Sequence, residues 1–330
     1  MKIYTVGDSD LAKAMWGGIE EHPDGHYIDG VFANAKNFKL KNKLVYWAKS
    51  HKFSGIINAL LQMVVVGFYS LSKVNYDRDI NYIILSDTRV VSYPREYFIY
   101  LAKKYNLRYV LVYLNPEVTA TEDIKEFEKI AYKVFSYSKS DCEKNGYERI
   151  YQIYSYTQDD FKDTNKNIEN DVFYWGSAND RIDILVDCYE KFKLNNLNVN
   201  MGIMLDKDTF SETRYNEEIV YNKKISYNDM LVYDSKANCI LEVVNSRQDG
   251  ITMRTMEAVA LNKKLLTNNV RVKECPFYDE RYIKVFDIPD DIDIGWVCQQ
   301  TSVDYDYNGD CLPIRLLERI IYNGKVEMCN

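Results

Sequence analysis

The sequence predicts an α/β protein with two Rossmann-like domains, each built on a mainly parallel sheet. The first reason is the alternation of short apolar segments, rich in β-branched residues, with helical segments. That alternation is typical of a parallel sheet covered on both faces. The second reason is length, because 330 residues exceed one hydrophobic core and two domains of about 150 residues are expected. The third is that the apolar runs end in polar side chains, and open parallel sheets bind ligands at such strand ends.

The first domain is expected over residues 1–156. Its strands are apolar runs bounded by polar or small residues, and its helices carry apolar side chains at helical spacing. Pro94 lies near the start of one predicted helix, where a missing N–H is tolerated. The predicted strands are residues 2–6, 27–33, 81–87, 108–115 and 133–138, and the predicted helices are residues 10–20, 41–71, 94–105 and 121–131.

The second domain follows a polar stretch, TQDDFKDTNKNIEND at residues 157–171, which is the predicted linker. We expect this domain over residues 172–330, and it includes an amphipathic C-terminal helix at residues 312–323. Its predicted strands begin with DVFYWG directly after the linker and continue at residues 198–204, 239–244 and 264–268.

Residues 245–269, NSRQDGITMRTMEAVALNKKLLTNN, are the most informative segment because they predict a loop, a helix and a strand in succession. Thr252 is a suitable N-cap, and Asn262 suits the helix end because Asn tolerates the left-handed conformation. The helix between them should be about ten residues long. Its apolar face consists of Met253, Met256 and Ala260. Helix starts that follow buried strands are where α/β proteins bind anions.

Two charged side chains on this helix indicate a ligand. Arg254 lies in the first turn, beside free main-chain N–H groups and the positive end of the helix dipole, and this combination suits a phosphate. Glu257 follows on nearly the same face and could accept hydrogen bonds from sugar hydroxyls. An equally simple interpretation is an Arg254–Glu257 pair on a solvated helix face, worth roughly a few tenths of a kcal/mol.

The same segment resembles the E-x7-E region of GT-B glycosyltransferases, in which two acidic residues are separated by seven others. Asp249 and Glu257 have this spacing. Residues 173–192 are similar to the first strand and helix of the C-terminal domain of that family, and residues 135–156 to the segment that closes its N-terminal domain. The wider pattern is similar to bacterial glycosyltransferases of capsule, exopolysaccharide and lipopolysaccharide gene clusters, and it consists of Gln248, Gly250, Thr252, Arg254, Glu257, Ala258 and then KKLLTNN.

The resemblance implies a GT-B enzyme whose two parallel sheets face a cleft. Such an enzyme moves a sugar from a nucleoside-diphosphate donor to a polysaccharide or lipid-linked acceptor, without a metal ion or another cofactor. Asp249 stands where the family has Glu, which weakens the implication that configuration at the anomeric carbon is retained. The implied donor site has Gly176, Arg181 and Thr252 near the phosphates, Gln248, Asp249 and Gly250 facing the phosphates or the donor sugar, Arg254 on the leaving group, and Glu257 on the ribose.

Composition narrows the class of protein further. A formal net charge of −7 argues against nucleic acid as the main partner. The seven cysteines are scattered singly, without zinc-ligand spacing or a disulfide framework. Neither a GxGxxG dinucleotide fingerprint nor a GxxxxGK phosphate loop occurs. The N-terminal sequence MKIYTVGDSD lacks a secretory pattern, so we expect a cytoplasmic protein.

A basic segment adds a possible membrane partner. Residues 36–52, KNFKLKNKLVYWAKSHK, contain six lysines, three aromatic residues and no acid. The apolar residues 53–71 that follow are too short, and too interrupted by polar side chains, to span a membrane. One interpretation is that residues 36–71 lie on an anionic membrane surface, at the inner face of the cytoplasmic membrane. The alternative is a solvated helix followed by a buried one.

The acceptor side is expected in the first domain, at the carboxyl ends of its strands. Asp87 is the candidate base, because an attacking alcohol must lose a proton and a carboxylate can take it. Its alternative role is to cap its own loop by accepting main-chain hydrogen bonds. Other candidates at these strand ends are Gly7, Asp8, Ser9, Thr88, Arg89 and Asn115, and His22 and His26 are alternative bases.

Three alternatives compete with the glycosyltransferase. VGDSD at residues 6–10 looks like the nucleophile block of GDS-type esterases, with Ser9 at the strand end. Those esterases need a histidine near the C-terminus, and the histidines here are His22, His26 and His51, so this likeness is weak. The other two alternatives are a nucleotide-sugar epimerase of the same architecture and a noncatalytic subunit that only binds a sugar nucleotide.

Overall fold

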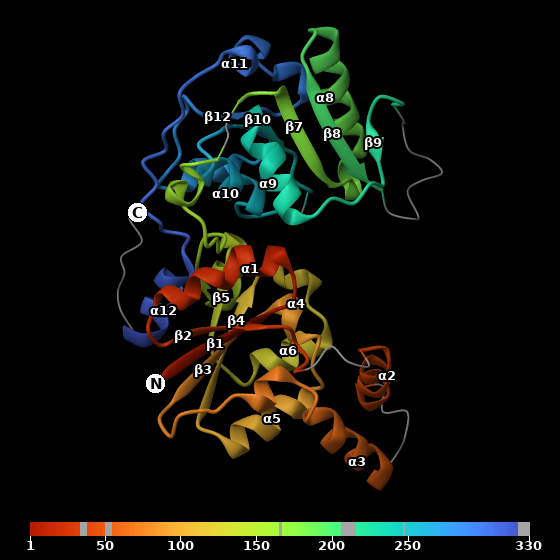
Figure 1. Ribbon diagram of the computed structural model, residues 1–330, viewed down its shortest axis with the longest axis vertical. Coiled ribbons are helices and arrows are strands. Elements are labelled where there is room, and N and C mark those ends of the chain that lie inside the picture. Colours follow the sequence, from red (N-terminus) through yellow and green to blue (C-terminus); the bar gives the residue numbers. More distant parts are fainter. Residues whose placement is uncertain (34–37, 50–54, 165–166, 206–215, 247, 323–330) are drawn as a thin grey trace. The chain divides into compact units, whose positions relative to one another are not determined.

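The chain forms two compact units, as the computed structural model shows (Figure 1). The structure describes residues 1–33, 38–49, 55–164, 167–205, 216–246 and 248–322. The first unit is Met1–Ser155 together with a segment that begins at Cys311, and the second unit is Tyr156–Asp310. Each unit contains one six-stranded sheet whose paired strands are all parallel, which confirms the predicted fold class of two parallel α/β domains.

The boundaries of the second unit differ from the predicted ones. Gln158 starts a short 3-10 turn, η4 (Gln158–Phe161), and donates to Asn262 Oδ1 at 2.7 Å. Most of the stretch predicted as a linker therefore belongs to the second unit, whose first strand begins at Asn170. The C-terminal helix α12 (Pro313–Tyr322) was expected in the second domain, but it belongs to the first unit.

Arg319 fastens α12 to the sheet of the first unit. Its guanidinium donates to the Arg149 main-chain oxygen at 2.7 Å and to the Glu148 carboxylate at 3.1 Å. The apolar stripe of α12 is buried at Leu316, Leu317 and Ile320. A helix buries such a stripe on whichever surface fits it, and helical spacing alone does not say which sheet supplies that surface.

The sheet of the first unit has the order β2-β1-β3-β4-β5-β6. Strand β1 pairs with β2 on one side and with β3 on the other, so the strand order reverses between β1 and β3. This is a doubly wound sheet of the flavodoxin-like type, extended by one strand. The strands are β1 (Lys2–Gly7), β2 (Gly25–Asp29), β3 (Asn81–Ser86), β4 (Leu107–Tyr113), β5 (Ala131–Ser136) and β6 (Glu148–Arg149).

One face of this sheet packs against a core that four helices share. Buried side chains of α2, α3, α5 and α6, such as Val45, Val65, Phe98 and Phe127, meet buried residues of β3 and β4, such as Leu111. The region predicted as helical at residues 41–71 contains two helices among its described residues. The helices of this unit, besides α12, are α1 (Asp10–Trp16), α2 (Phe38–Lys49), α3 (Gly55–Val66), α4 (Asp87–Val90), α5 (Arg95–Lys104), α6 (Glu122–Glu128) and α7 (Lys139–Asn145), with 3-10 turns η1 (Gly17–Glu21), η2 (Ser70–Lys73) and η3 (Glu117–Thr119).

The sheet of the second unit has the order β12-β11-β10-β7-β8-β9. Numbered within the unit, this is the 3-2-1-4-5-6 order of dinucleotide-binding domains, in which the strand order reverses beside the first strand. Here the reversal lies between β7 and β10, which pair directly. The strands are β7 (Asn170–Ser177), β8 (Val199–Met204), β9 (Val220–Tyr221), β10 (Ala237–Glu242), β11 (Lys264–Thr267) and β12 (Ile283–Val285).

The helices of the second unit enclose a separate core. Side chains of α8 such as Leu185 and Phe192 pack with residues of β7, β8 and β10, including Leu241, and all three are fully buried. Within the described residues, no helix has both the length and the apolar composition needed to cross a membrane. The helices are α8 (Ile182–Leu194), α9 (Tyr227–Ser235), α10 (Met253–Ala260) and α11 (Ile294–Cys298), with 3-10 turns η5 (Asn179–Arg181), η6 (Val270–Glu274) and η7 (Pro289–Asp291).

Candidate functional site

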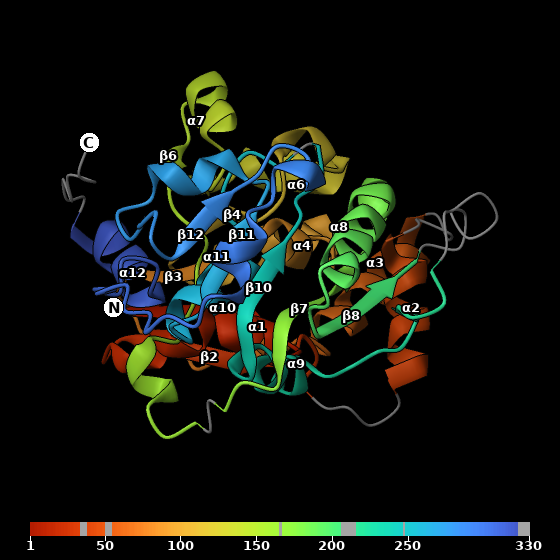
Figure 2. The same cartoon turned by 90° about the horizontal axis from the view of Figure 1, so that it is seen from above.

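The strand reversal of the second unit gathers most of the predicted site residues. The chain passes from β7 outward to β8 and β9 and then returns to β10 on the other side of β7. Strand β7 therefore lies between β8 and β10 (Figure 2). In doubly wound sheets, ligands bind outside the carboxyl ends of the strands at such a reversal. The loop after β7 contains Arg181, and the loop after β10 leads into α10. These two loops are therefore the candidate site.

Arg181 folds back over the end of β7. Its Nε donates to the Ala178 oxygen at 3.1 Å, and its two Nη groups donate to the main-chain oxygens of Ser177 and Val243. Val243 directly follows β10, so this one side chain ties the two strand ends together. All three acceptors are neutral carbonyls, which orient the guanidinium without cancelling its charge. The strand reversal therefore carries a positive charge that is held in a fixed orientation.

Asp180 joins the same two loops through Ser246. Its carboxylate accepts from the Ser246 main-chain N–H at 3.3 Å and from the Ser246 hydroxyl at 2.7 Å. Burial acts to raise the pKa of Asp180, but these hydrogen bonds and the neighbouring Arg181 outweigh it and hold the pKa below its usual value. Gly176, predicted at the strand end, is the next-to-last residue of β7, where an added Cβ would come within 3.0 Å of the Tyr174 hydroxyl.

The loop before α10 is braced by its own side chains. Gln248 Nε2 donates to the Gly250 oxygen at 3.0 Å, and Asn269 Nδ2 donates to the same oxygen at 2.9 Å. Asp249 pairs with Arg271 at 2.8 Å, and its side chain is 18% exposed. Arg271 was not among the predicted site residues, although it follows β11 and so lies at the same edge of the sheet. The neighbouring position 247 lies outside the described residues.

The structure confirms how α10 begins and ends. Thr252 is the N-cap, because its hydroxyl accepts from the Arg254 main-chain N–H at 3.0 Å. The helix has eight residues, slightly fewer than expected. Asn262, just beyond it, has the left-handed conformation with φ of 51°.

Arg254 and Glu257 lie in the interior of the second unit. Arg254 Nη1 contacts both oxygens of Asp234, at 2.9 and 3.0 Å, and Glu257 Oε2 at 3.1 Å. Its Nη2 donates to the Trp175 oxygen at 2.6 Å. The side chains of Arg254, Asp234 and Glu257 are 12%, 0% and 2% exposed. The pair that could have been a solvated surface contact therefore exists, but it is buried.

The buried positions of Arg254 and Glu257 do not fit the roles predicted for them. Arg254 was assigned to the leaving group and Glu257 to the ribose, yet the two side chains bind each other and Asp234. The physical reason is that every residue of α10 from Thr255 to Ala260 is buried, so charges on this helix need partners inside the protein. Burial raises the pKa of Glu257 and of Asp234, and the positive charge of Arg254 opposes this. One guanidinium thus pairs with two buried carboxylates.

Glu242, the last residue of β10, was missed by the sequence-based prediction. Its buried carboxylate accepts hydrogen bonds from the hydroxyls of Thr252 at 2.6 Å, Thr255 at 2.8 Å and Thr267 at 2.5 Å. Because Thr252 caps α10 and Thr267 ends β11, this carboxylate fixes the helix start against two strands. An acid inside the apolar run CILEVV is a signal, since a buried carboxylate needs donors.

Asp87, the predicted base of the first unit, is buried at the end of β3. Its carboxylate accepts from the Thr88 N–H at 2.8 Å, the Leu114 N–H at 3.2 Å and Asn115 Nδ2 at 2.9 Å. Burial raises the pKa of Asp87, and the hydrogen bonds from Asn115 and the two N–H groups oppose the rise. The Thr88 contact is the one that the loop-capping alternative describes, whereas Leu114 and Asn115 belong to the segment that follows β4. The role as a base stays a prediction.

The other candidates of the first unit have local partners. Arg89 forms a two-pronged ion pair with Asp8 at 2.7 and 2.8 Å, across the reversal between β1 and β3. The Ser9 hydroxyl caps α1 by accepting from the Ala12 N–H at 3.2 Å, a structural task unrelated to an esterase nucleophile. His22 Nδ1 accepts from the Asp24 N–H at 3.1 Å, and the His26 ring stacks on Tyr4. His51 lies outside the described residues.

Comparisons with known proteins place the fold. No protein-family model and no curated protein matches the sequence. Among solved structures, sucrose-phosphate synthase from Thermosynechococcus elongatus is similar with a TM-score of 0.52 and 11% identity, over 98% of this chain and 100% of that one. T4 phage BGT in complex with UDP-glucose gives a TM-score of 0.43 and 15% identity, over 90% and 88% of the two chains. A protein from Listeria monocytogenes assigned as a UDP-N-acetylglucosamine 2-epimerase gives 0.49 and 8%, over 97% and 95%.

At 11% identity, the similarity to the synthase concerns the fold. It extends over both units of the chain, so the predicted two-domain GT-B fold, with a Rossmann-like sheet in each domain, is confirmed. The cleft between the domains and the roles of the individual site residues stay predictions.

Proposed function

We propose that this chain is a GT-B glycosyltransferase that moves a sugar from a nucleoside-diphosphate donor to a polysaccharide or lipid-linked glycan. The observation that carries the proposal is Arg181, a guanidinium fixed by neutral oxygens at the strand reversal of the second unit. Beside it, Ser246 links the loop after β7 to the loop that enters α10. The start of a helix and an arginine whose hydrogen bonds, among the described residues, go to main-chain oxygens together suit a diphosphate.

The proposed chemistry requires positive charge where negative charge develops. As the bond between the anomeric carbon and the leaving oxygen breaks, charge accumulates on the β-phosphate while the sugar gains oxocarbenium character. Arg181 and the first-turn N–H groups of α10 stabilise that charge, and groups held in place before the reaction do so most effectively. No step of this proposed reaction requires a metal ion or another cofactor.

The buried charges are proposed to act through the position of α10. Arg254, Glu257 and Asp234 hold the helix from inside, and Glu242 holds its N-cap Thr252. We therefore assign Arg254 and Glu257 as positioning residues in place of direct ligands of the diphosphate and the ribose. The loop from Gln248 to Thr252, with Asp249 braced by Arg271, then faces the donor.

The acceptor is proposed to meet the first unit, with Asp87 as the base that takes its hydroxyl proton. The resemblance implies an acceptor of the capsule, exopolysaccharide or lipopolysaccharide type. Such acceptors are assembled on lipids, so we propose that the enzyme works in the cytoplasm, at the inner face of the membrane. The basic residues 36–52 and the apolar residues after them favour this location.

Titration of the whole protein with UDP, GDP, CDP and dTDP by calorimetry tests the donor half of the proposal. One of them is expected to bind, and failure of all four would contradict it. The corresponding sugar nucleotides are then incubated with a lipid-linked glycan, and the products are separated. Transfer of the sugar supports the transferase, a changed sugar still attached to its nucleotide assigns the epimerase, and binding without turnover assigns the noncatalytic subunit.

A further inference from the structure

We propose that the first unit binds the phosphate headgroup of an anionic lipid in a concavity between α3 and α5. This inference deepens the proposed function and rests on it in one respect. A lipid-linked acceptor is the reason why a lipid-binding surface would be useful. The concavity has a volume of about 220 Å³ and is bordered by Lys73 and Lys104. Met63 and Val66 of α3 line its apolar side, and Ser72 and Tyr100 add hydroxyl groups.

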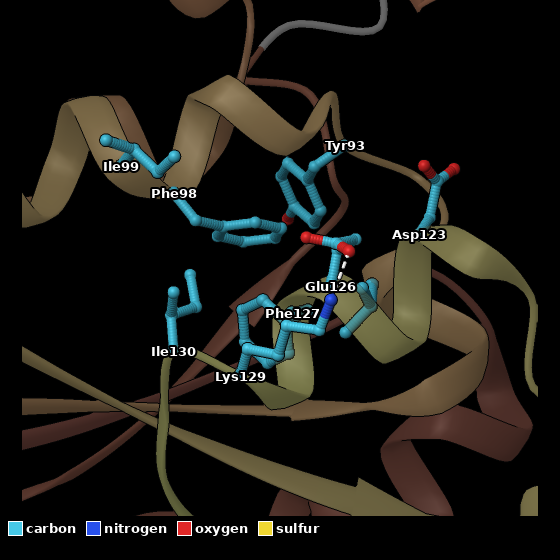
Figure 3. A pocket seen from close by; sticks show the side chains of 9 residues that line it. Tyr93, Phe98, Ile99, Asp123, Glu126, Phe127, Lys129 and Ile130 are labelled. Atoms are coloured by element: carbon cyan, nitrogen blue, oxygen red, sulfur yellow. Dashed lines mark hydrogen bonds and ion pairs between the residues drawn. The ribbon is translucent and has the colours of Figure 1, made fainter.

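The charge of this concavity is unusual. Its lining contains two lysines and no acidic side chain. A second concavity, between α5 and α6, offers a direct contrast: it has a volume of about 120 Å³, and its lysine, Lys129, pairs with Glu126 at 2.5 Å (Figure 3). The lysine there is already neutralised by a carboxylate of its own lining. The Lys73–Lys104 concavity instead presents two ammonium groups that a phosphate would bind.

Helix α3 beside this concavity is apolar on both faces. Its inner face is buried at Val65 and packs Leu61 against the core of the first unit. Its outer face exposes a stripe at helical spacing, where Ile57, Leu60, Met63 and Val64 are 62%, 57%, 72% and 53% exposed. A helix in a globular protein normally turns polar side chains outward, and a contiguous apolar stripe indicates a surface that becomes covered.

The charge around the stripe indicates which kind of partner covers it. Residues 31–76 contain seven lysines and no aspartate, glutamate or arginine, in a chain whose net charge is −7. Lys43 on α2, like the stripe, is exposed. A second copy of the chain would bring this same lysine-rich surface against itself, because twofold interfaces are self-complementary, and like charges oppose that contact. An anionic bilayer accepts both the apolar stripe and the lysines.

The dimensions fit a helix lying along a membrane. The 12 residues of α3 extend about 18 Å, which is shorter than a bilayer core. Inserted sideways, the stripe would reach roughly 5–10 Å into the boundary between headgroups and acyl chains. The concavity at the C-terminal end of α3 would then lie at the level of the lipid phosphates.

Co-sedimentation with vesicles tests the inference. The whole protein is mixed with vesicles of phosphatidylcholine and phosphatidylglycerol, or of phosphatidylcholine alone, at low and high salt. We expect binding to the anionic vesicles that weakens as salt rises. Replacing Lys73→Gln and Lys104→Gln together should lower the partition coefficient about 30-fold, because each lysine near an anionic surface contributes about 1 kcal/mol. Both side chains are exposed, so the fold is not at risk.

Two control pairs with the same change in charge sharpen the result. Lys129→Gln with Lys162→Gln, two exposed lysines that do not line the concavity, should leave binding unchanged. Lys43→Gln with Lys103→Gln should weaken binding less than the pair in the concavity. Equal losses from the Lys43–Lys103 pair and from the Lys73–Lys104 pair would overturn the headgroup site. No binding of the parent protein to anionic vesicles would overturn the lipid assignment.

Sedimentation velocity tests whether a second copy of the chain covers the stripe on α3. A dimer of the parent protein that dissociates in Met63→Gln would assign the stripe to a second copy and overturn the proposal. Nucleotide titration of the Lys73→Gln, Lys104→Gln variant keeps the two proposals apart. Loss of vesicle binding with unchanged nucleotide binding supports the lipid site, whereas a parent protein that binds vesicles and no nucleotide contradicts only the proposed glycosyltransferase.

Discussion

Each of the two sheets has an arginine at the point where its strand order reverses, but the arginines have different partners. In the first unit, Arg89 is matched by the two oxygens of Asp8. In the second, Arg181 is held by main-chain oxygens only, among the described residues. A carboxylate cancels a positive charge, while a carbonyl orients it and leaves it available. The comparison therefore favours an anion at the second sheet and an uncharged hydroxyl at the first.

The largest expected effect concerns the first unit, where the comparison favours an uncharged hydroxyl. Asp87→Asn removes the proposed base and should lower kcat by about a hundredfold to ten-thousandfold, with nucleotide affinity unchanged. Because burial raises the pKa of Asp87, the rise of kcat with pH should occur above the usual carboxylate range in the parent enzyme. Steady-state assays across pH measure both effects.

Asp141 supplies the matched control for Asp87. It is also a buried aspartate that accepts a main-chain hydrogen bond, from the Glu117 N–H at 2.7 Å, but it follows β5 and is not a predicted site residue. Asp141→Asn should lower stability without a specific loss of turnover. If Asp87→Asn behaves in the same way, Asp87 only caps its loop.

The next effect concerns the interior of the second unit. Arg254→Met leaves Asp234 and Glu257 buried without their cation, which should lower the free energy of unfolding by about 3–5 kcal/mol. Urea unfolding followed by tryptophan fluorescence measures the change. Arg281→Met is the control, because Arg281 is exposed and pairs only with its neighbour Asp279 among the described residues. Equal losses in the two variants would show that the buried cluster has no special role.

The same variant has a defined pH dependence. The pKa values of Asp234 and Glu257 are raised by burial, so the folded state favours their protonated forms. Their contribution to stability is fully present below about pH 4, where the unfolded chain is also protonated, and is lost as pH rises through their folded values. Without Arg254 these values rise further. The deficit of Arg254→Met should therefore be smallest near pH 4 and should grow as the pH rises through the folded pKa values of the parent protein, about 8 for Asp234.

A smaller effect separates the two arginines directly. Arg181→Gln should weaken nucleoside-diphosphate binding by about tenfold to a hundredfold, the range expected for hydrogen bonds that involve a charged group. Arg89→Gln, its counterpart in the first unit, should leave nucleotide affinity unchanged. Calorimetry on both variants provides the measurement. Equal losses in the two would remove the distinction between the sheets.

The smallest effect is the change in the free energy of unfolding when the Asp8–Arg89 ion pair is broken. The side chains are 47% and 17% exposed, so solvent screens their attraction. Asp8→Asn should lower the free energy of unfolding by about 1 kcal/mol or less. A loss as large as that of Arg254→Met would mean that the first unit also depends on a charge at its strand reversal.

Local signals in the sequence predicted the parts of the fold that neighbouring residues determine. The order of strands and helices, the N-cap Thr252 and the left-handed Asn262 all depend on residues within a few positions. The partners of the charged side chains do not. Asp234 lies 20 residues before Arg254, on α9, and only the packing of α9 against α10 brings the two together.

The same limit explains why two site residues changed role. Helical spacing placed Arg254 and Glu257 on one face correctly, but it could not say that this face turns inward. The apolar residues on both sides of Glu257, Met256 and Ala258, are fully buried and give the physical reason. A charged pair embedded in apolar neighbours is better interpreted as an internal pair than as a ligand site.

The return of α12 to the first unit has a consequence for how this protein is made. The second unit is one uninterrupted stretch, Tyr156–Asp310, whereas the first needs residues from both sides of it. During synthesis the second unit is therefore complete before the first has received Leu317 and Arg319. Produced separately, residues 156–310 would keep all six strands of their sheet, β7 to β12. The first unit would need α12 supplied as a peptide or joined to it by circular permutation.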